Sequence, residues 1–92
     1  MEDESTVRES VRALIAQMAP VKGAQVSRSS DLSVDLGYDS LRLMELATLI
    51  EERFGIHEIG EDDAAEADTV GEVEDLVLRL LRDVQRPPAT AV

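Results

Sequence analysis

One serine stands where its hydroxyl could take part in chemistry. Ser40 follows Asp39 in the segment Asp-Leu-Gly-Tyr-Asp-Ser-Leu, residues 35–41, and an apolar repeat with helical spacing comes next. Both side chains are good helix N-caps, because their oxygens accept hydrogen bonds from the unpaired backbone N–H groups of a first turn. Asp39 can cap the helix alone, which would leave the Ser40 hydroxyl available at the helix start.

The position of the only histidine argues against a catalytic role for Ser40. A serine nucleophile needs a general base within hydrogen-bond reach, and that base needs an orienting partner. His57 lies beyond the far end of the predicted helix, about 20 Å or more from Ser40 at a rise of 1.5 Å per residue. We interpret His57 as an exposed loop residue, and we expect no catalytic residues and no enzymatic activity.

A metal site is not expected either. The chain contains no cysteine, so thiolate sites and disulfides are excluded, which fits a reducing compartment. The segment 31–42 matches several ligand positions of an EF-hand loop. However, Leu36 occupies the position that requires glycine, and Arg42 occupies that of the bidentate glutamate. The two most constrained positions of a calcium loop therefore fail.

The charge of the chain limits its partners. It holds 20 acidic and 9 basic residues, for a net charge of -11, and Tyr38 and Phe54 are its only aromatic residues. Nucleic-acid binding relies on a basic face or on stacking rings, so we expect neither nucleic acid nor an anionic membrane as partner. Partners should present basic patches instead. The acidic run over residues 60–75 is expected to be a solvated loop and short helix.

The length predicts a single domain over residues 1–92, with a core at about residues 6–84 and a flexible tail at 85–92. The acidic N-terminus lacks the basic start and apolar run of a signal peptide. No apolar stretch approaches the ~20 residues that cross a bilayer. We therefore expect a cytoplasmic protein, and we expect it to be a monomer.

Apolar residues at helical spacing predict a first helix before the Ser40 segment and a last helix near the end of the chain. The first should span residues 6–19, opened by Thr6 and Glu9 in capping-box spacing and ended before Pro20. The last should open with a second capping box, formed by Thr69 and Glu72, and continue to about residue 84. The interval between residues 56 and 68 has room for one short helical piece.

The connection over residues 20–38 has no sustained period and is expected to be a long, ordered loop. Four apolar residues should pin it to the core: Val26, Leu32, Val34 and Leu36.

The helix that starts at Asp39 or Ser40 should display a solvent-facing strip beside the serine hydroxyl. It should end at Phe54, with Gly55 as its C-cap. On a helical wheel the core stripe is Leu43, Leu46, Ala47, Ile50 and Phe54. The exposed side next to Ser40 carries Leu41, Met44, Glu45, Thr48, Glu51 and Glu52. Two neighbouring apolar residues rimmed by carboxylates are typical of a docking surface.

The segment 35–41 at a helix start resembles the attachment motif of acyl carrier proteins. Glu45-Leu46, the segment 49–56 and the segment 69–76 continue the resemblance, which covers about residues 6–84. It implies an all-α four-helix bundle with a long first loop and a short third helix. It also implies that Ser40 carries a covalent 4'-phosphopantetheine arm, attached by a separate transferase that uses coenzyme A. Acyl groups would ride on the arm as thioesters.

The amino-acid sequence of the motif resembles that of discrete carriers of type II polyketide synthases most closely. Fatty acid carriers usually have an acidic residue where this chain has Arg42, and Tyr38 departs from the pattern of peptidyl carriers. A fatty acid carrier and an aminoacyl carrier remain alternatives. A plain helical interaction module, in which Ser40 is only an N-cap, is an alternative of another class.

The implied partners are a phosphopantetheinyl transferase, an acyltransferase, a ketosynthase and tailoring enzymes with basic docking patches. Asp39 and the exposed side of the helix would take part in recognising them.

Overall fold

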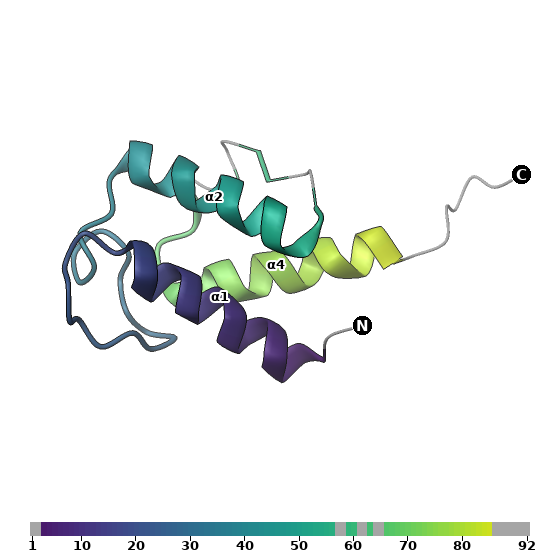
Figure 1. The fold of residues 1–92 in the computed structure, drawn as a ribbon, viewed down its shortest axis with the longest axis horizontal. Coiled ribbons are helices and arrows are strands. Elements are labelled where there is room, and N and C mark those ends of the chain that lie inside the picture. The colour runs from purple at the N-terminus through teal and green to yellow at the C-terminus, as the bar shows by residue number, and fades with distance from the viewer. Residues whose placement is uncertain (1–2, 57–58, 61–62, 64–65, 86–92) are drawn as a thin grey trace, which may run out of the picture.

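The computed structural model describes residues 3–56, 59–60, 63 and 66–85. Its helices are α1 (Glu4–Met18), α2 (Ser40–Phe54) and α4 (Val70–Gln85), as Figure 1 shows. The described residues form no strand beyond one isolated bridge between Asp31 and Thr69, so the all-helical prediction is confirmed. The short helix expected between residues 56 and 68 falls largely outside the described residues, as do His57 and most of the tail.

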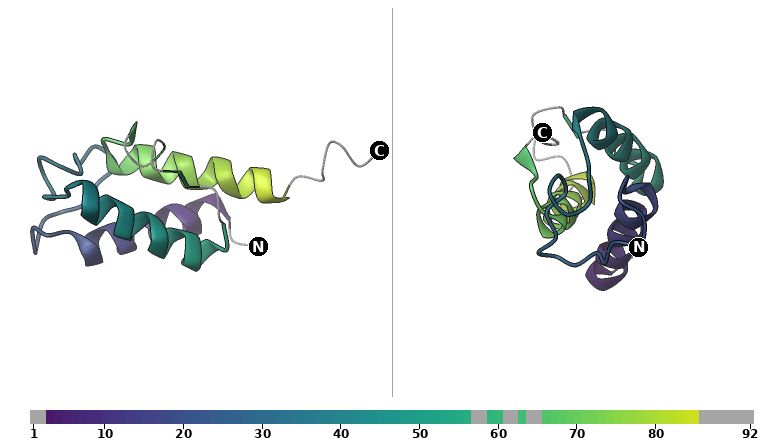
Figure 2. Two further views of the ribbon diagram at one scale, coloured as in Figure 1. Left: turned by 90° about the horizontal axis from the view of Figure 1, so that it is seen from above. Right: turned by 90° about the vertical axis from the view of Figure 1, so that its left-hand side faces the viewer.

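The three helices lie side by side along the long axis of the molecule. Viewed end-on, α1 and α2 form one side and α4 covers the other (Figure 2), and α1 packs against both α2 and α4. The loop between α1 and α2 closes one end of the bundle, where α1 ends and α2 begins (Figure 1). No helix in the described part of the chain is long and apolar enough to cross a membrane.

The boundaries of α2 agree with the prediction, whereas α1 begins two residues early. Asp3 is the N-cap of α1, because its Oδ1 accepts a hydrogen bond from the Thr6 N–H at 2.8 Å. This hydrogen bond lowers the pKa of the Asp3 carboxyl. The predicted capping box of Thr6 and Glu9 is therefore wrong: an aspartate three residues upstream caps at least as well as a threonine, and the intervening residues tolerate helix.

The predicted capping box at the start of α4 is confirmed. The Glu72 carboxylate accepts hydrogen bonds from the Asp68 and Thr69 N–H groups at 3.0 and 2.9 Å. The Glu72 N–H donates in return to the Thr69 hydroxyl at 3.3 Å. These backbone hydrogen bonds lower the pKa of the Glu72 carboxyl.

The lowered pKa predicts a pH-dependent contribution of Glu72 to stability. A carboxylate whose pKa is lower in the folded state stabilises the fold above its unfolded pKa, and this contribution is lost as the pH falls through the folded pKa. Glu72→Gln keeps the acceptor oxygen but not the charge. We expect this variant to have a lower Tm than wild type at neutral pH, and the difference to shrink as the pH falls through the lowered pKa of the folded state. Equal Tm differences at pH 7 and pH 3 would contradict this expectation.

The core is apolar and runs the length of the bundle. Its least exposed members include Val7, Val11, Ile15, Leu32, Leu36, Ile50, Ile56, Val70 and Val77. Leu32 and Leu36 are among these buried residues and Val26 is half-buried, so three of the four predicted loop anchors are confirmed.

Val34, the fourth predicted anchor, is 82% exposed, so that part of the prediction is wrong. The N–H groups of Asp35 and Leu36 both donate to the Asp31 carbonyl, which gives the segment a helix-like turn. In such a turn, residues 32 and 36 share one face and residue 34 lies on the opposite face.

Backbone hydrogen bonds join the long loop to the start of α4. The N–H groups of Val70 and Gly71 donate to the carbonyls of Ser30 and Arg28, at 3.0 and 2.9 Å. The Leu32 N–H donates to the Asp68 carbonyl at 2.8 Å. The loop thereby satisfies N–H groups of α4 that have no partner within the helix, and it is held in place as predicted.

Glu74 is fully buried, although its acidic surroundings predicted a solvated segment. One carboxylate oxygen lies 2.9 Å from Arg8 Nη1 and 3.6 Å from Arg28 Nη1, and the other lies 2.9 Å from Arg12 Nε. The hydrogen bond to Glu74 is the main cause that raises the pKa of Arg8. This cluster ties α1, the long loop and α4 together around one buried charge.

Candidate functional site

Ser40 is the first residue of α2 and is exposed. Asp39, in extended conformation, is the N-cap: its Oδ1 accepts from the Arg42 N–H at 2.8 Å, and its carbonyl accepts from the Leu43 N–H at 2.9 Å. The Ser40 hydroxyl makes no hydrogen bond with any residue that the structure describes. The prediction that Asp39 alone caps the helix is confirmed, and the serine hydroxyl is available to a partner.

The residues two before and two after Ser40 are both bonded to α1. Tyr38 is 3% exposed, and its hydroxyl donates to the Ile15 carbonyl at 2.7 Å. Burial raises the pKa of Tyr38 to about 12. On the other side, Arg42 Nε donates to the Met18 carbonyl at 2.9 Å.

The sequence analysis missed both of these contacts. The sequence does contain a signal for the contact of Arg42, because the last turn of α1 contains no basic residue of its own. Its free carbonyls therefore need donors from elsewhere in the chain.

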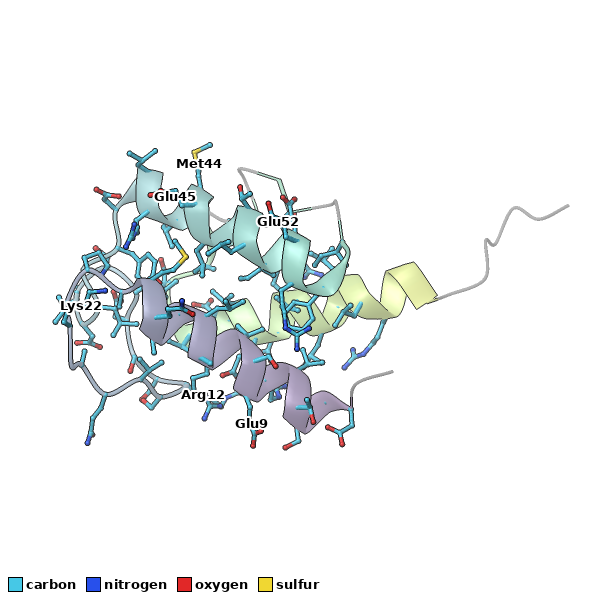
Figure 3. The ribbon with its side chains drawn as sticks, viewed as in Figure 1. Glu9, Arg12, Lys22, Met44, Glu45 and Glu52 are labelled. Atoms are coloured by element: carbon cyan, nitrogen blue, oxygen red, sulfur yellow. The ribbon has the colours of Figure 1, made fainter. Side chains whose placement is uncertain are left out.

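The exposed face of α2 is largely as the helical wheel predicts. Leu41 is 69% exposed and Met44 is 46% exposed. Met44, Glu45 and Glu52 follow one another along α2, and Met44 points away from α1 (Figure 3). We call this surface the α2 strip and define it by its exposed members, Leu41, Met44, Glu45, Thr48 and Glu52.

Two features of the α2 strip differ from expectation. Glu51, predicted to be exposed, is half-buried because it lies at the edge between the strip and the core face. Glu45 is not an isolated carboxylate, since its Oε1 lies 3.6 Å from Arg42 Nη1. The surface nearest Ser40 is thus apolar with partly balanced charge, and Glu52 extends the acidic character toward the end of the helix.

No metal centre is formed by the residues that the structure describes: nowhere among them do three histidine, cysteine, aspartate or glutamate side chains converge. Asp39, the carboxylate next to Ser40 in the sequence, is occupied as a cap. The described residues thus place an exposed serine hydroxyl at the start of α2, next to a carboxylate that is already engaged as the helix cap.

Residues 9–77 match the sequence family described as "Phosphopantetheine attachment site". Over 65 residues, 71% of this chain and 82% of the other, the chain is 40% identical to the acyl carrier protein of Helicobacter pylori (strain G27). The chain belongs to the acyl carrier protein family. Members of this family are carriers and not catalysts, and they hold a covalent 4'-phosphopantetheine.

Solved structures of other acyl carrier proteins share the fold of this carrier. It superposes on the acetyl actinorhodin acyl carrier protein from Streptomyces coelicolor with a TM-score of 0.70 and 32% identity, covering 84% of this chain and 92% of that one. For the hexanoyl form from the actinorhodin polyketide synthase of the same organism, the TM-score is 0.66 and the identity 30%, with 82% and 90% covered.

The start of α2 fits the phosphate of a phosphopantetheine group. The N–H groups of Ser40 and Leu41 have no partner among the residues that the structure describes, and they lie at the positive end of the helix dipole. An anion at an exposed helix N-terminus gains about 0.3 to 1 kcal/mol. The carrier can therefore orient such a group at this point, although this gain is too small to drive its attachment.

One cavity of about 20 Å³ lies between α2 and α4, lined by Leu43, Leu46, Ala47, Ile59, Ala67, Val73 and Leu76. This volume is about what one water molecule needs and is far too small for an acyl chain.

Proposed function

We propose that Ser40 is the attachment site of the 4'-phosphopantetheine arm, and that the protein presents acyl intermediates on this arm to the enzymes of a polyketide pathway. The observation that carries the proposal is the exposed Ser40 hydroxyl in the first turn of α2, which has no hydrogen bond to the described residues. Asp39 caps the helix, so the serine is not needed for that purpose. The match to the phosphopantetheine attachment family spans this segment. The cofactor supplies the reactive thiol, while the protein supplies position and recognition.

The attachment reaction needs a base for the Ser40 hydroxyl proton, and the partner enzyme must supply it. The Ser40 oxygen would form a bond to a phosphorus of coenzyme A as the bond from that phosphorus to the nucleotide breaks. The hydroxyl proton must leave with a base, and Asp39 is occupied as a helix cap. In this proposal the phosphopantetheinyl transferase supplies the base, and the carrier supplies only a positioned acceptor.

Two observations support the polyketide pathway over fatty acid synthesis. The solved structures that resemble this carrier include actinorhodin acyl carrier proteins, and Arg42 stands where fatty acid carriers usually have an acidic residue. The proposal includes a short helix between α2 and α4, which completes a four-helix bundle. It also includes action as a monomer in the cytoplasm, with an acyltransferase, a ketosynthase and tailoring enzymes as partners.

Loading with acetyl-coenzyme A tests the carrier function. A broad-specificity phosphopantetheinyl transferase should add one acetyl-phosphopantetheine per chain, and hydroxylamine should then remove the acetyl group and leave the arm. Supplying the loaded carrier to a polyketide ketosynthase pair and to a fatty acid ketosynthase tests the pathway. Faster turnover by the fatty acid enzyme would contradict the polyketide assignment and leave the carrier function intact.

The α2 strip is the proposed recognition surface, with Asp39 and Glu51 at its margins. Carboxylates such as Glu45 should steer the approach of basic partner surfaces and so affect association rates more than final affinity. The apolar side chains of Leu41 and Met44 should hold the docked complex, at about 1 to 2 kcal/mol each if largely buried.

Charge reversal separates these two roles. We expect Glu45→Lys to slow arm attachment at low ionic strength and to have less effect at high ionic strength, because salt screens the steering field. Met44→Ala should slow it at both ionic strengths. Glu9→Lys is the matched control, since Glu9 is exposed on α1, on the opposite side of the molecule from Glu45 (Figure 3). Equal rates for Glu45→Lys and Glu9→Lys at low salt would show that the strip is not the recognition surface.

A further inference from the structure

Arg42 links three parts of the molecule beside Ser40. Its backbone N–H is capped by Asp39 at 2.8 Å, its Nε donates to the Met18 carbonyl at 2.9 Å, and its Nη1 lies 3.6 Å from Glu45. The Arg42 side chain is 35% exposed. Met18 is the last residue of α1, so its carbonyl has no partner within the helix. The last turn of α1 contains no basic residue of its own. Arg42 of α2 supplies a cationic donor to it at 2.9 Å, and Lys22 of the long loop supplies a second, more distant one to the Gln17 carbonyl at 3.4 Å.

The contact is one of a pair that brackets Ser40. Tyr38, two residues before Ser40, donates to the Ile15 carbonyl in the same last turn of α1. Arg42, two residues after Ser40, donates to the Met18 carbonyl. The chain on either side of the serine is therefore fastened to α1, whereas the Ser40 hydroxyl has no hydrogen bond to any residue that the structure describes.

We propose that Arg42 is a positioning residue, which holds the first turn of α2 on the end of α1 and thereby fixes the Ser40 hydroxyl for arm attachment. The proposal rests on the proposed function of Ser40. Helix ends fray, and a turn that opens for part of the time presents its hydroxyl in the wrong place. Misplacement of a reacting group by about 1 Å can lower a rate by orders of magnitude.

A positioning role predicts a specific kinetic effect. The α2 strip extends along the helix beyond the first turn, so a transferase that docks there should still bind when this turn frays. The loss should therefore appear in kcat and leave KM nearly unchanged. If Arg42 acted through its charge, its removal would instead change KM, because the surface would become more acidic.

Two substitutions separate the hydrogen bond from the charge. Arg42→Gln places an amide nitrogen where Arg42 has Nε, so it keeps a donor for the Met18 carbonyl and loses the charge. Arg42→Met has a similar length and loses both. Arg79→Met is the control for the loss of one positive charge, since Arg79 is an exposed residue of α4.

We expect Arg42→Met to lower kcat for phosphopantetheinylation about tenfold, the effect of losing one charge-assisted hydrogen bond. Arg42→Gln should retain kcat within about threefold of wild type, because a neutral donor restores most of that bond. Arg79→Met should load at the wild-type rate. All assays are run well below the measured Tm of each variant.

Amide hydrogen exchange of the protein without its arm gives a second measurement. Arg42→Met should speed exchange of the backbone amides at positions 42 and 43, which donate to Asp39 in the wild-type protein, while amides of α4 stay as protected as in wild type. Arg42→Gln should show wild-type exchange at both positions.

The outcomes distinguish this inference from the function on which it rests. Wild-type protein that gains no arm would overturn the proposed function, and the exchange data would still test the positioning of the turn. Equal loss of kcat in Arg42→Gln and Arg42→Met, or a change confined to KM, would overturn the positioning role. So would Arg42→Met with wild-type kcat and wild-type exchange.

Discussion

Ser40→Ala is expected to abolish phosphopantetheine attachment and to leave the fold intact. The substitution removes the acceptor oxygen, while Asp39 continues to cap α2 through its bond to the Arg42 N–H. Alanine is a good helix former, and the Ser40 hydroxyl has no partner among the described residues, so stability should change by no more than about 0.5 kcal/mol. Intact mass after incubation with coenzyme A and a transferase measures attachment of the arm. Thermal unfolding followed by circular dichroism measures the stability of the fold.

Ser5→Ala is the matched control, because Ser5 is also an exposed serine in the first turn of a helix, near the start of α1. This control should gain the arm at the wild-type rate. A Ser40→Ala variant that still gains one arm would move the attachment site elsewhere. A variant that loses its helical signal would show that Ser40 has a structural role that its exposure does not suggest.

Glu74→Gln is expected to cause the largest loss of stability of any single charge change among the residues that the structure describes. Three arginines surround a carboxylate that is 0% exposed, and the neutral amide removes the charge that they share, so that Arg8 and Arg28 keep only exposed carboxylates such as Asp75. Breaking a buried ion pair typically costs about 3 to 5 kcal/mol. The arginines here are 21%, 36% and 51% exposed and can be rehydrated, so we expect about 2 to 4 kcal/mol.

Asp75→Asn provides the comparison, since Asp75 pairs with Arg8 and Arg28 but is 55% exposed. Exposed ion pairs contribute at most about 1 kcal/mol. For a domain of this size, the Glu74 variant should therefore lower Tm by roughly 10 to 20 °C and the Asp75 variant by only a few degrees. Similar Tm values for the two variants would show that the buried charge does not hold the bundle together.

Features fixed by one segment alone were predictable from the sequence. The bounds of α2 follow from Asp39, a strong N-cap, and from Gly55, whose φ of 68° favours glycine at a helix end. The α2 strip follows from helical geometry alone, apart from Glu51 at its edge. The predicted start of α1 was wrong by two residues, because Asp3 and Thr6 are both competent caps three residues apart.

Features that depend on distant partners could not be predicted in this way. Glu74 lies in an acidic run that looks solvated, and the arginines that bury it come from α1 and the long loop. The same holds for the bond from Arg42 to Met18, which joins residues 24 apart. Local pattern reveals which residues share a face of one helix, but it does not reveal which side chain on another element completes a hydrogen bond.

The assignment of the arm to Ser40 is tested most directly by mapping the modified residue in wild-type protein. After incubation with coenzyme A and a broad-specificity transferase, the protein is cleaved into peptides and fragmented in a mass spectrometer. We predict a single phosphopantetheine, on Ser40, in every modified molecule. Modification at Ser5, at Ser10 or within residues 27–30, with Ser40 unmodified, would contradict the account.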